Sequence, residues 1–163
     1  MNHEQQELVL DLVSKKISRE EFVEVFFGAE GISDGFLCGE LEAAFVNKDA
    51  DSLECLLIVG FLFGFSAECS NVLGRLLIQD WHISHEEIAR ALKPLKCPEV
   101  IESLYKAAMT KHPYIASEYA LGVKCIYAIY EIGTDAAKEK LQMLTQVDNL
   151  VLSELAGRLL SSM

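Results

Sequence analysis

The sequence predicts an all-α protein built from stacked helical hairpins. Apolar residues recur at helical spacing along the whole 163-residue chain, and no segment alternates convincingly as a strand does. The three prolines, Pro94, Pro98 and Pro113, all stand where a helix can begin or end. A short motif also recurs at intervals close to the length of a two-helix repeat. We therefore expect an α-solenoid, in which neighbouring units bury their apolar faces against one another.

The recurring motif is GRLL, which occurs at 74–77 and again at 157–160. GRLL aligns Ser70 with Ser153, and a second motif, SEYA at 117–120, which returns as SELA at 153–156, aligns Ser117 with Ser153. The three serines are 47 and 36 residues apart. This spacing brackets the period of two-helix repeats. We therefore expect these three helices to occupy equivalent places in successive repeats.

Periodicity and local capping signals define ten helices. Ser18 with Glu21, and Ser84 with Glu87, have the spacing of a capping box at a helix start. Thr134, which follows a glycine, is a candidate N-cap. The predicted ranges are 4–15, 19–27, 36–47, 51–64, 67–80, 85–93, 98–110, 113–131, 135–145 and 149–161.

Length and composition indicate one globular domain. The chain is 51% apolar and 24% charged, which is typical of a folded protein. We divide it into acidic N-terminal helices, residues 1–50, and repeats, residues 51–163. The longest uncharged stretch, 55–67, is shorter than the roughly 20 residues of a membrane span. Within it, the spacing of Gly60 and Gly64 predicts close helix packing.

The cysteine pattern favours reduced thiols in the cytoplasm. No CxxC pair occurs, and an odd number of cysteines leaves one unpaired in any disulfide scheme. The N-terminal residues also lack the basic and apolar regions of a signal peptide. The five cysteines are Cys38, Cys55, Cys69, Cys97 and Cys125.

The negative charge is concentrated near the N-terminus. The net charge is −11, of which residues 1–54 carry −9 and residues 55–163 carry −2. Such a field repels phosphate backbones and anionic lipid, and it attracts basic partners. We therefore expect a protein partner and neither nucleic acid nor membrane, although an acidic surface can also serve solubility alone.

Catalytic and cofactor motifs are missing from the sequence. GxSxG, GxGxxG and GK[ST] do not occur, so we expect no enzyme and no cofactor. His85 begins an HExxH-like segment, but Ala89 stands where the second histidine is required. Asp49 begins a calcium-loop-like segment, but Glu54 stands where glycine is required. We therefore expect no metal site.

Three side chains have alternative interpretations. Tyr127, on the polar side of helix 113–131, is a candidate exposed aromatic contact, although a single exposed ring is usually unremarkable. Trp81 either packs beneath its loop or anchors a partner. Cys97 stands at a helix start near two lysines, where a thiolate can be stabilised, or else it is an inert thiol.

Residues 88–105 and 124–137 resemble HEAT-like repeats. The segments read IARALKPLKCPEVIESLY and KCIYAIYEIGTDAA, and with their surroundings they cover about the C-terminal half of the chain. Cys97 stands where the family usually has aspartate before the proline. The resemblance implies a right-handed α-solenoid of degenerate HEAT-like hairpins, with additional helices before it.

A short acidic helical chain of this kind is similar to immunity proteins of bacterial contact-dependent inhibition and related polymorphic-toxin systems. The resemblance implies binding and neutralisation of a cognate toxin C-terminal domain. The acidic charge favours a basic toxin, such as a nuclease. A HEAT-like adaptor for another protein or peptide, and a chromophore lyase using Cys97, are the alternatives. The candidate contacts are Glu20, Glu24, Glu40, Glu42, Asp49, Asp51 and Tyr127.

Overall fold

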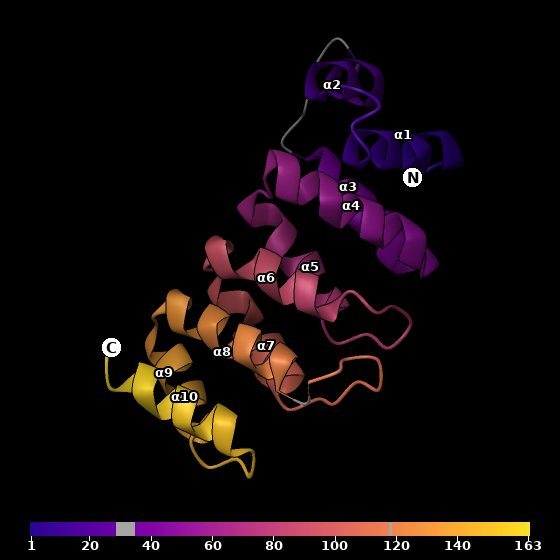
Figure 1. The fold of residues 1–163 in the computed structure, drawn as a ribbon. Helices are drawn as coiled ribbons and strands as arrows, with labels where there is room; N and C mark the ends of the chain where they lie inside the picture. Colours follow the sequence, from indigo (N-terminus) through magenta and orange to yellow (C-terminus); the bar gives the residue numbers. More distant parts are fainter. Residues whose placement is uncertain (29–34, 118) are drawn as a thin grey trace. The chain divides into compact units, whose positions relative to one another are not determined.

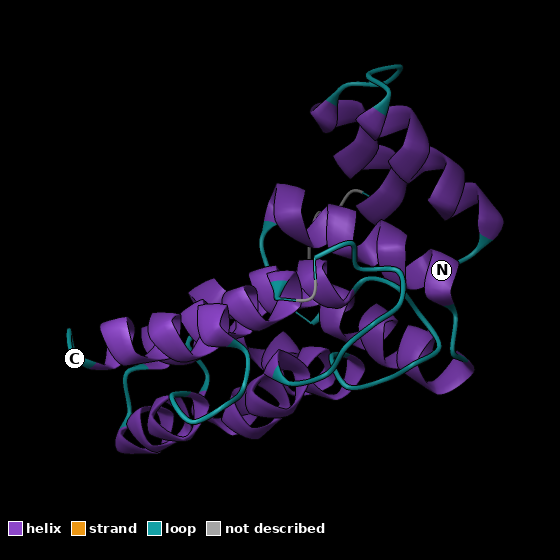
Figure 2. Cartoon of the chain, turned by 60° about the horizontal axis from the view of Figure 1, so that its bottom comes forward, coloured by secondary structure: helices purple, strands orange, loops and turns teal. Residues whose placement is uncertain are grey.

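The chain forms α-helices and short 3-10 helices. A computed structural model describes residues 1–28, 35–117 and 119–163. These residues contain ten α-helices and no strand (Figures 1 and 2), so the all-α prediction is confirmed. They divide into an N-terminal unit, Met1–Cys69, and a C-terminal unit, Ser70–Met163. Within the described residues, no helix is long and apolar enough to cross a membrane.

The N-terminal unit contains four α-helices and one 3-10 helix. Helix α1 packs against α2 and α4, and α3 packs against α4 and η1. Ser18 accepts a hydrogen bond from the backbone of Glu21, whose side chain accepts one from the backbone of Ser18, so this capping box is confirmed. The elements are α1 (His3–Val13), α2 (Arg19–Phe27), α3 (Phe36–Asn47), α4 (Ala50–Phe63) and η1 (Ala67–Cys69).

Aromatic rings fill the space between α2 and the end of α4. Phe22 and Phe26, one turn apart, stack with their centroids 4.7 Å apart, and Phe63 stacks on Phe22 at 5.5 Å. Arg19 donates a hydrogen bond to the carbonyl of Leu62, and its guanidinium group lies 4.6 Å from the Phe63 centroid. Offset ring pairs and a cation over a ring both stabilise such contacts. These contacts fix α2 on α4.

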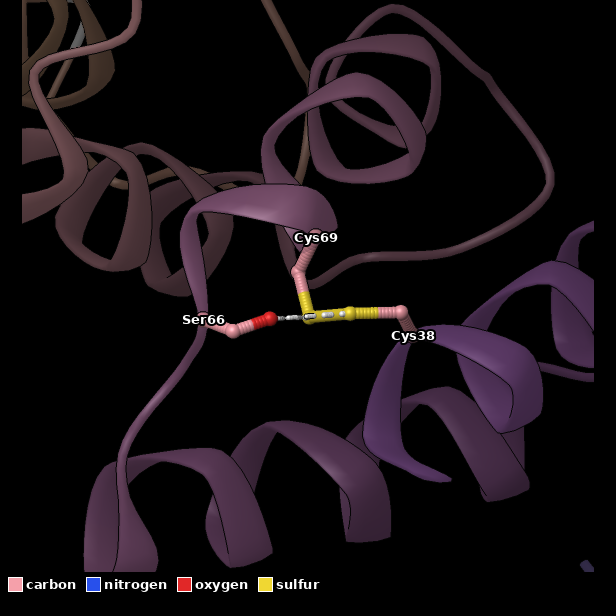
Figure 3. Close-up of a disulfide and its surroundings, with 3 residues drawn as sticks. All are labelled: Cys38, Ser66 and Cys69. Carbon is pink, nitrogen blue, oxygen red and sulfur yellow. Dashed lines mark hydrogen bonds between the residues drawn. A yellow bond between two sulfur atoms is a disulfide. The ribbon is translucent and has the colours of Figure 1, made fainter. Parts of the chain in front are cut away.

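A disulfide joins Cys38 of α3 to Cys69 of η1 (Figure 3). The expectation that all five cysteines are reduced is therefore wrong for this pair. The hydroxyl group of Ser66 lies 3.3 Å from the sulfur of Cys38 and 3.7 Å from that of Cys69. Folding brings together two cysteines that are 31 residues apart, which their sequence spacing does not reveal. Cys55, Cys97 and Cys125 are not part of a disulfide.

Gly60 accommodates an aromatic ring where the sequence predicts close helix packing. A Cβ atom at Gly60 would lie 2.1 Å from the ring of Phe65, which follows the same helix. Gly64 ends α4 with φ of +102°, a backbone conformation that glycine adopts without strain. The GxxxG spacing therefore serves the end of one helix, because the chain turns at Gly64 and folds Phe65 back onto Gly60.

The C-terminal unit contains six α-helices and one short 3-10 helix. Thr134 accepts a hydrogen bond from the backbone of Ala137, so its predicted N-cap is confirmed. Gly133 ends the preceding helix in the left-handed conformation. The elements are α5 (Ser70–Leu76), α6 (His85–Leu95), η2 (Pro98–Val100), α7 (Ile101–Ala108), α8 (Ala120–Ile132), α9 (Asp135–Leu144) and α10 (Leu150–Leu160).

These helices form two layers of three. Helices α5 and α9 both contact α7, while α6 and α10 both contact α8. Each helix of the first layer also contacts the next helix along the chain in the second layer (Figure 1). The register predicted from GRLL is therefore wrong in part. Ser117 lies in the loop just before α8, and Ser153 lies in α10 of the same layer, but Ser70 begins α5 in the other layer.

Two glycines of the GRLL motif show why the register fails. A Cβ atom at Gly74 would lie 2.8 Å from Val100, whereas one at Gly157 would meet only Thr145, at 3.9 Å. The two glycines therefore have different packing roles. The GRLL motif is typical of a helix with one small and two apolar residues. Helices of either layer can have this pattern, so the motif does not determine the register.

Two predicted helices differ clearly from the structure, and so does one predicted cap. Helix 113–131 begins only at Ala120, and Glu118 lies outside the described residues. Helix 67–80 is replaced by η1 and α5, which ends at Leu76. The side chain of Ser84 makes no capping bond, and its backbone N–H, which a capping box would pair with Glu87, donates instead to Nδ1 of His82.

Candidate functional site

The predicted contacts on α2 are exposed. Glu20 and Glu24 are four residues apart, so they project from the same side of the helix. Phe22 and Phe26 occupy the opposite, buried side. The Ser18 cap and the aromatic contacts of the helix therefore hold these two carboxylates on a fixed surface.

The two predicted contacts on α3 have different surroundings. Glu40 is half-buried, and its carboxylate lies 3.0 Å from the α-amino group of Met1. Glu42, also half-buried, projects in another direction, because residues two apart differ by about 200° around a helix. The two side chains therefore do not form one charged surface.

Asp49 and Asp51 have different structural roles. Asp49 is the N-cap of α4 and accepts hydrogen bonds from the backbone and hydroxyl group of Ser52. These bonds, led by the one from the hydroxyl group, lower the pKa of Asp49. Asp51, in the first turn of α4, is exposed. The structure thus gives Asp49 a helix-capping role and leaves Asp51 on the surface.

Tyr127 lies on the polar side of α8, as predicted, but it is half-buried. The ammonium group of Lys93 lies 5.3 Å from its ring centroid, a cation–π distance. The ring lines a pocket of about 440 Å³ between α8 and α10. Val151, Glu154 and Arg158 form part of the same pocket.

A cluster of aromatic side chains, absent from the predicted site residues, joins two loops of the C-terminal unit. The rings of His82 and His85 stack at 4.4 Å, and those of His85 and His112 lie 3.9 Å apart. The phenol of Tyr114 donates a hydrogen bond to His85. Trp81 packs edge-on against His82 at 4.9 Å, in agreement with the packing interpretation. We call these five residues the histidine cluster.

The hydrogen bonds fix the tautomers of two histidines. His85 donates from Nε2 to the carbonyl of Gln79, 2.6 Å away, so its Nδ1 accepts the bond from Tyr114. His82 likewise donates to the carbonyl of Leu76, while its Nδ1 accepts from the backbone of Ser84. Both rings are neutral, and all four ring nitrogens have partners. The ring nitrogens of His82 and His85 therefore serve to hold the loop in place.

The electrostatics do not suit a His–Tyr catalytic pair. Burial, followed by the charge of His82, lowers the pKa of His85 to about 4. Burial, followed by the charges of Glu86 and Glu87, raises the pKa of Tyr114 to about 12. Acid–base catalysis at neutral pH favours pKa values near 7. The pKa values of His85 and Tyr114 are both shifted away from 7, so the pair is suited to a stable hydrogen bond.

His85 and Cys97 are the residues for which the sequence raised metal or thiol chemistry. Among the described residues, no group of three or more His, Cys, Asp or Glu side chains is placed to hold a metal ion. Cys97 is half-buried at the start of η2. The sequence signal that could have revealed the histidine cluster is the placement of His82 and His112 in loops between predicted helices, with His85 at the start of the helix after the first loop.

No family model matches the chain, and no curated protein or solved structure is significantly similar to it.

Proposed function

We propose that the protein acts by binding a basic protein partner, as an immunity protein that neutralises a cognate toxin domain. The feature that carries this proposal is the charge difference between the two units. Residues 1–69 carry 14 acidic and 4 basic side chains, a net charge of −10, whereas residues 70–163 carry 11 and 10, a net charge of −1. A localised field of this kind accelerates the encounter with a basic surface.

Exposed carboxylates on rigid helices support this role. Glu20 and Glu24 of α2 and Asp51 of α4 are exposed, and both helices begin with a side-chain cap. Because the backbone at these positions is ordered before binding, little conformational entropy is lost there on association. We place the primary electrostatic contact at these three residues.

The two-layer arrangement of the C-terminal unit supports a HEAT-like interpretation. We propose that the hairpins α5–α6, α7–α8 and α9–α10 are degenerate HEAT-like repeats of a right-handed α-solenoid. Each hairpin buries its apolar side against its neighbours, as repeat units do. In this proposal the repeats form a scaffold, the protein acts without catalysis or cofactor, and it works in the cytoplasm.

The first experiment is co-expression with the product of the adjacent upstream gene. We expect a complex that survives purification and restores growth to cells that produce the toxin. A toxic adjacent product that neither forms this complex nor is neutralised would contradict the immunity proposal.

A charge-neutralised variant then tests the electrostatic contact. We expect the triple variant E20Q/E24Q/D51N to lower the association rate roughly tenfold at low salt, because exposed interface charges act mainly on encounter. Its dependence of affinity on salt should also weaken. An unchanged salt dependence would remove these carboxylates from the interface.

The matched control for this variant lies in the C-terminal unit. E99Q/D135N/E139Q makes the same change in net charge through exposed side chains. Asp135 stands in the first turn of α9, as Asp51 does in α4, so the helix-dipole effects are also matched. This control should leave both the association rate and its salt dependence nearly unchanged.

A HEAT-like adaptor is the second candidate, favoured by the pocket beside Tyr127. Its volume of about 440 Å³ and its apolar residues Val123 and Leu155 suit one side chain of a peptide. Tyr127→Ala would then abolish binding of a cellular peptide while leaving toxin neutralisation unaffected. Loss of toxin neutralisation alone would instead assign this pocket to the immunity function.

A further inference from the structure

Exposed apolar side chains of the C-terminal unit gather along one edge. The loops 77–84, 109–119 and 145–149 each join the two helices of a hairpin, and they lie on the same edge of this unit (Figure 1). We call the described residues of these loops, together with Leu150 and Val151, the loop edge. Its large exposed apolar side chains are Ile78, Ile83, Met109, Tyr114, Tyr119, Leu150 and Val151.

This gathering is uneven within the unit. Among its described residues, the only other large exposed apolar side chains are Met143 and Met163. Ile83 is 69% exposed and Leu150 is 68% exposed. Single exposed apolar residues are ordinary, but a group of them at one edge is typical of a contact surface. The loop edge therefore has the composition of a protein-binding surface.

Two pockets provide concave sites on this edge. One, of about 300 Å³, is lined by residues that include Pro113, Ile115 and Leu121. The other, of about 330 Å³, includes Met109 and Val147. Thr110 and Lys111 line both pockets, so the two sites are adjacent. Neighbouring apolar pockets of this size suit side chains that project from one partner segment.

The histidine cluster stabilises two of the three loops. His85 accepts a hydrogen bond from Tyr114, and its ring packs against that of His112, so the start of α6 is connected to loop 109–119. His82 connects the two ends of loop 77–84, because it forms hydrogen bonds with Leu76 at the end of α5 and with Ser84. Because these bonds exist before a partner arrives, fewer loop conformations are lost on binding. The buried histidines thus give the loop edge a preformed shape.

Charge selects the class of partner. The charged side chains in the described loop residues are Asp80, Lys111 and Asp148, so the edge itself is weakly acidic. The chain carries a net charge of −11, which opposes association with a second copy and with phosphate-rich surfaces. A basic protein segment experiences the opposite effect. The apolar side chains of such a segment can enter the two pockets of the loop edge.

We propose that the loop edge docks a basic protein segment that presents apolar side chains, such as one face of an amphipathic helix. The inference rests on the proposed function for the basic character of the partner. It adds a second contact of different chemistry, because the carboxylates of α2 and α4 attract charge whereas the loop edge binds apolar side chains. The two contacts therefore respond differently to salt and to substitution.

Two synthetic peptides of equal length and charge test the proposal on the full-length chain. One is a Lys/Leu amphipathic helix, and the other has serine in place of every leucine. Titration of ¹⁵N-labelled protein should show amide shifts in 77–84 and in the described part of 109–119 for the Lys/Leu peptide alone. If both peptides shift the same residues, or if the Lys/Leu peptide leaves these loops unchanged, the docking proposal is wrong.

Substitutions provide a second test. We expect I83S/M109S to weaken binding of the Lys/Leu peptide about tenfold or more, because hot-spot apolar contacts are lost. Met143→Ser is the matched control, since Met143 is 42% exposed and Met109 is 46% exposed, but Met143 lies on α9 outside the loop edge. Equal weakening by the two changes would contradict the proposal. Circular dichroism checks that each variant is folded.

The outcomes separate this inference from the proposed function. Loop-edge binding of the Lys/Leu peptide, combined with failure to neutralise the adjacent toxin, would retain the docking surface and reject the immunity role. If I83S/M109S leaves toxin neutralisation unaffected and the peptide shifts no loop amides, the immunity role would be retained and the docking surface rejected. Expected weakening by I83S/M109S should persist at high salt, unlike that caused by E20Q/E24Q/D51N.

Discussion

Tyr114 donates a hydrogen bond to Nδ1 of His85, a residue 29 positions earlier in the chain. The bond joins the α7–α8 loop to the first residue of α6. It also completes the hydrogen bonding of a ring whose other nitrogen donates to Gln79. Since His85 is fully buried, each nitrogen depends on its protein partner.

Tyr114→Phe should destabilise the C-terminal unit by about 1–3 kcal/mol, the cost of leaving a buried acceptor without its donor. Urea unfolding followed by the fluorescence of Trp81, the only tryptophan, reports on this unit. Tyr119→Phe is the control, since Tyr119 is an exposed tyrosine of the same loop. It should change stability by less than about 0.5 kcal/mol. Equal midpoints for the two variants would contradict a role for the His85 bond.

The same cluster predicts a loss of stability in mild acid. The pKa of His85 is about 4 in the folded chain, against 6.5 for an unperturbed histidine, and burial also lowers the pKa of His82 and His112. Between these values the unfolded chain binds more protons, so stability is complete above pH 6.5 and falls as pH decreases towards 4. His85 alone accounts for at most about 3 kcal/mol.

Urea unfolding at pH values between 7 and 4 measures this effect. Most carboxylates titrate below the upper part of this window, where histidine protonation dominates. Replacing His85 with glutamine should flatten the dependence there, even if the variant is less stable at pH 7. A wild-type chain whose stability is constant from pH 6.5 to 5 would contradict buried neutral histidines.

Local sequence signals determined much of the fold. Ser18 and Thr134 cap their helices as predicted, and Phe22 and Phe26 form a buried pair one turn apart. These features depend on residues within a few positions of one another, so the spacing of residue types reveals them. The second and third predicted helices, 19–27 and 36–47, match α2 and α3 at both ends.

Long-range contacts account for what the sequence did not reveal. Whether Cys38 reaches Cys69 depends on how α3 meets η1, and the His85–Tyr114 bond depends on how two loops meet. Ser84 has the residue spacing of an N-cap, but His82 takes its backbone N–H. Among the candidate contacts, Asp49 has the charge of a surface residue but the geometry of a cap. Composition distinguishes none of these alternatives.

Reduction of the Cys38–Cys69 disulfide should destabilise the N-terminal unit. The bond closes a segment of 31 residues that includes α4, and a cross-link of this length contributes about 3–4 kcal/mol by restricting the unfolded chain. Hydrogen exchange with and without reductant should show faster exchange in residues 36–63. C38S/C69S should reproduce this change, and reductant should then have no further effect.

A cysteine outside the disulfide provides the control for that experiment. Cys97→Ser leaves the disulfide intact, so reductant should still accelerate exchange in the N-terminal unit. Identical exchange of the wild-type chain in oxidising and reducing buffer would contradict a stabilising disulfide. Mass analysis of the unreduced chain, after blocking of free thiols, establishes that three cysteines react and two do not.

Gly122 and Gly157 should respond oppositely to alanine, although both lie inside helices. A Cβ atom at Gly122 would lie 2.8 Å from the carbonyl oxygen of Ala108 and from the side chain of Leu152. Because a backbone carbonyl cannot move without shifting α7, Gly122→Ala should destabilise the chain by about 1–3 kcal/mol. At Gly157 the nearest neighbour would be 3.9 Å away, so alanine should stabilise α10 by roughly 0.5–1 kcal/mol. Thermal unfolding of both variants measures the difference, and a lower midpoint for Gly157→Ala would mean that α10 packs more closely than this geometry allows.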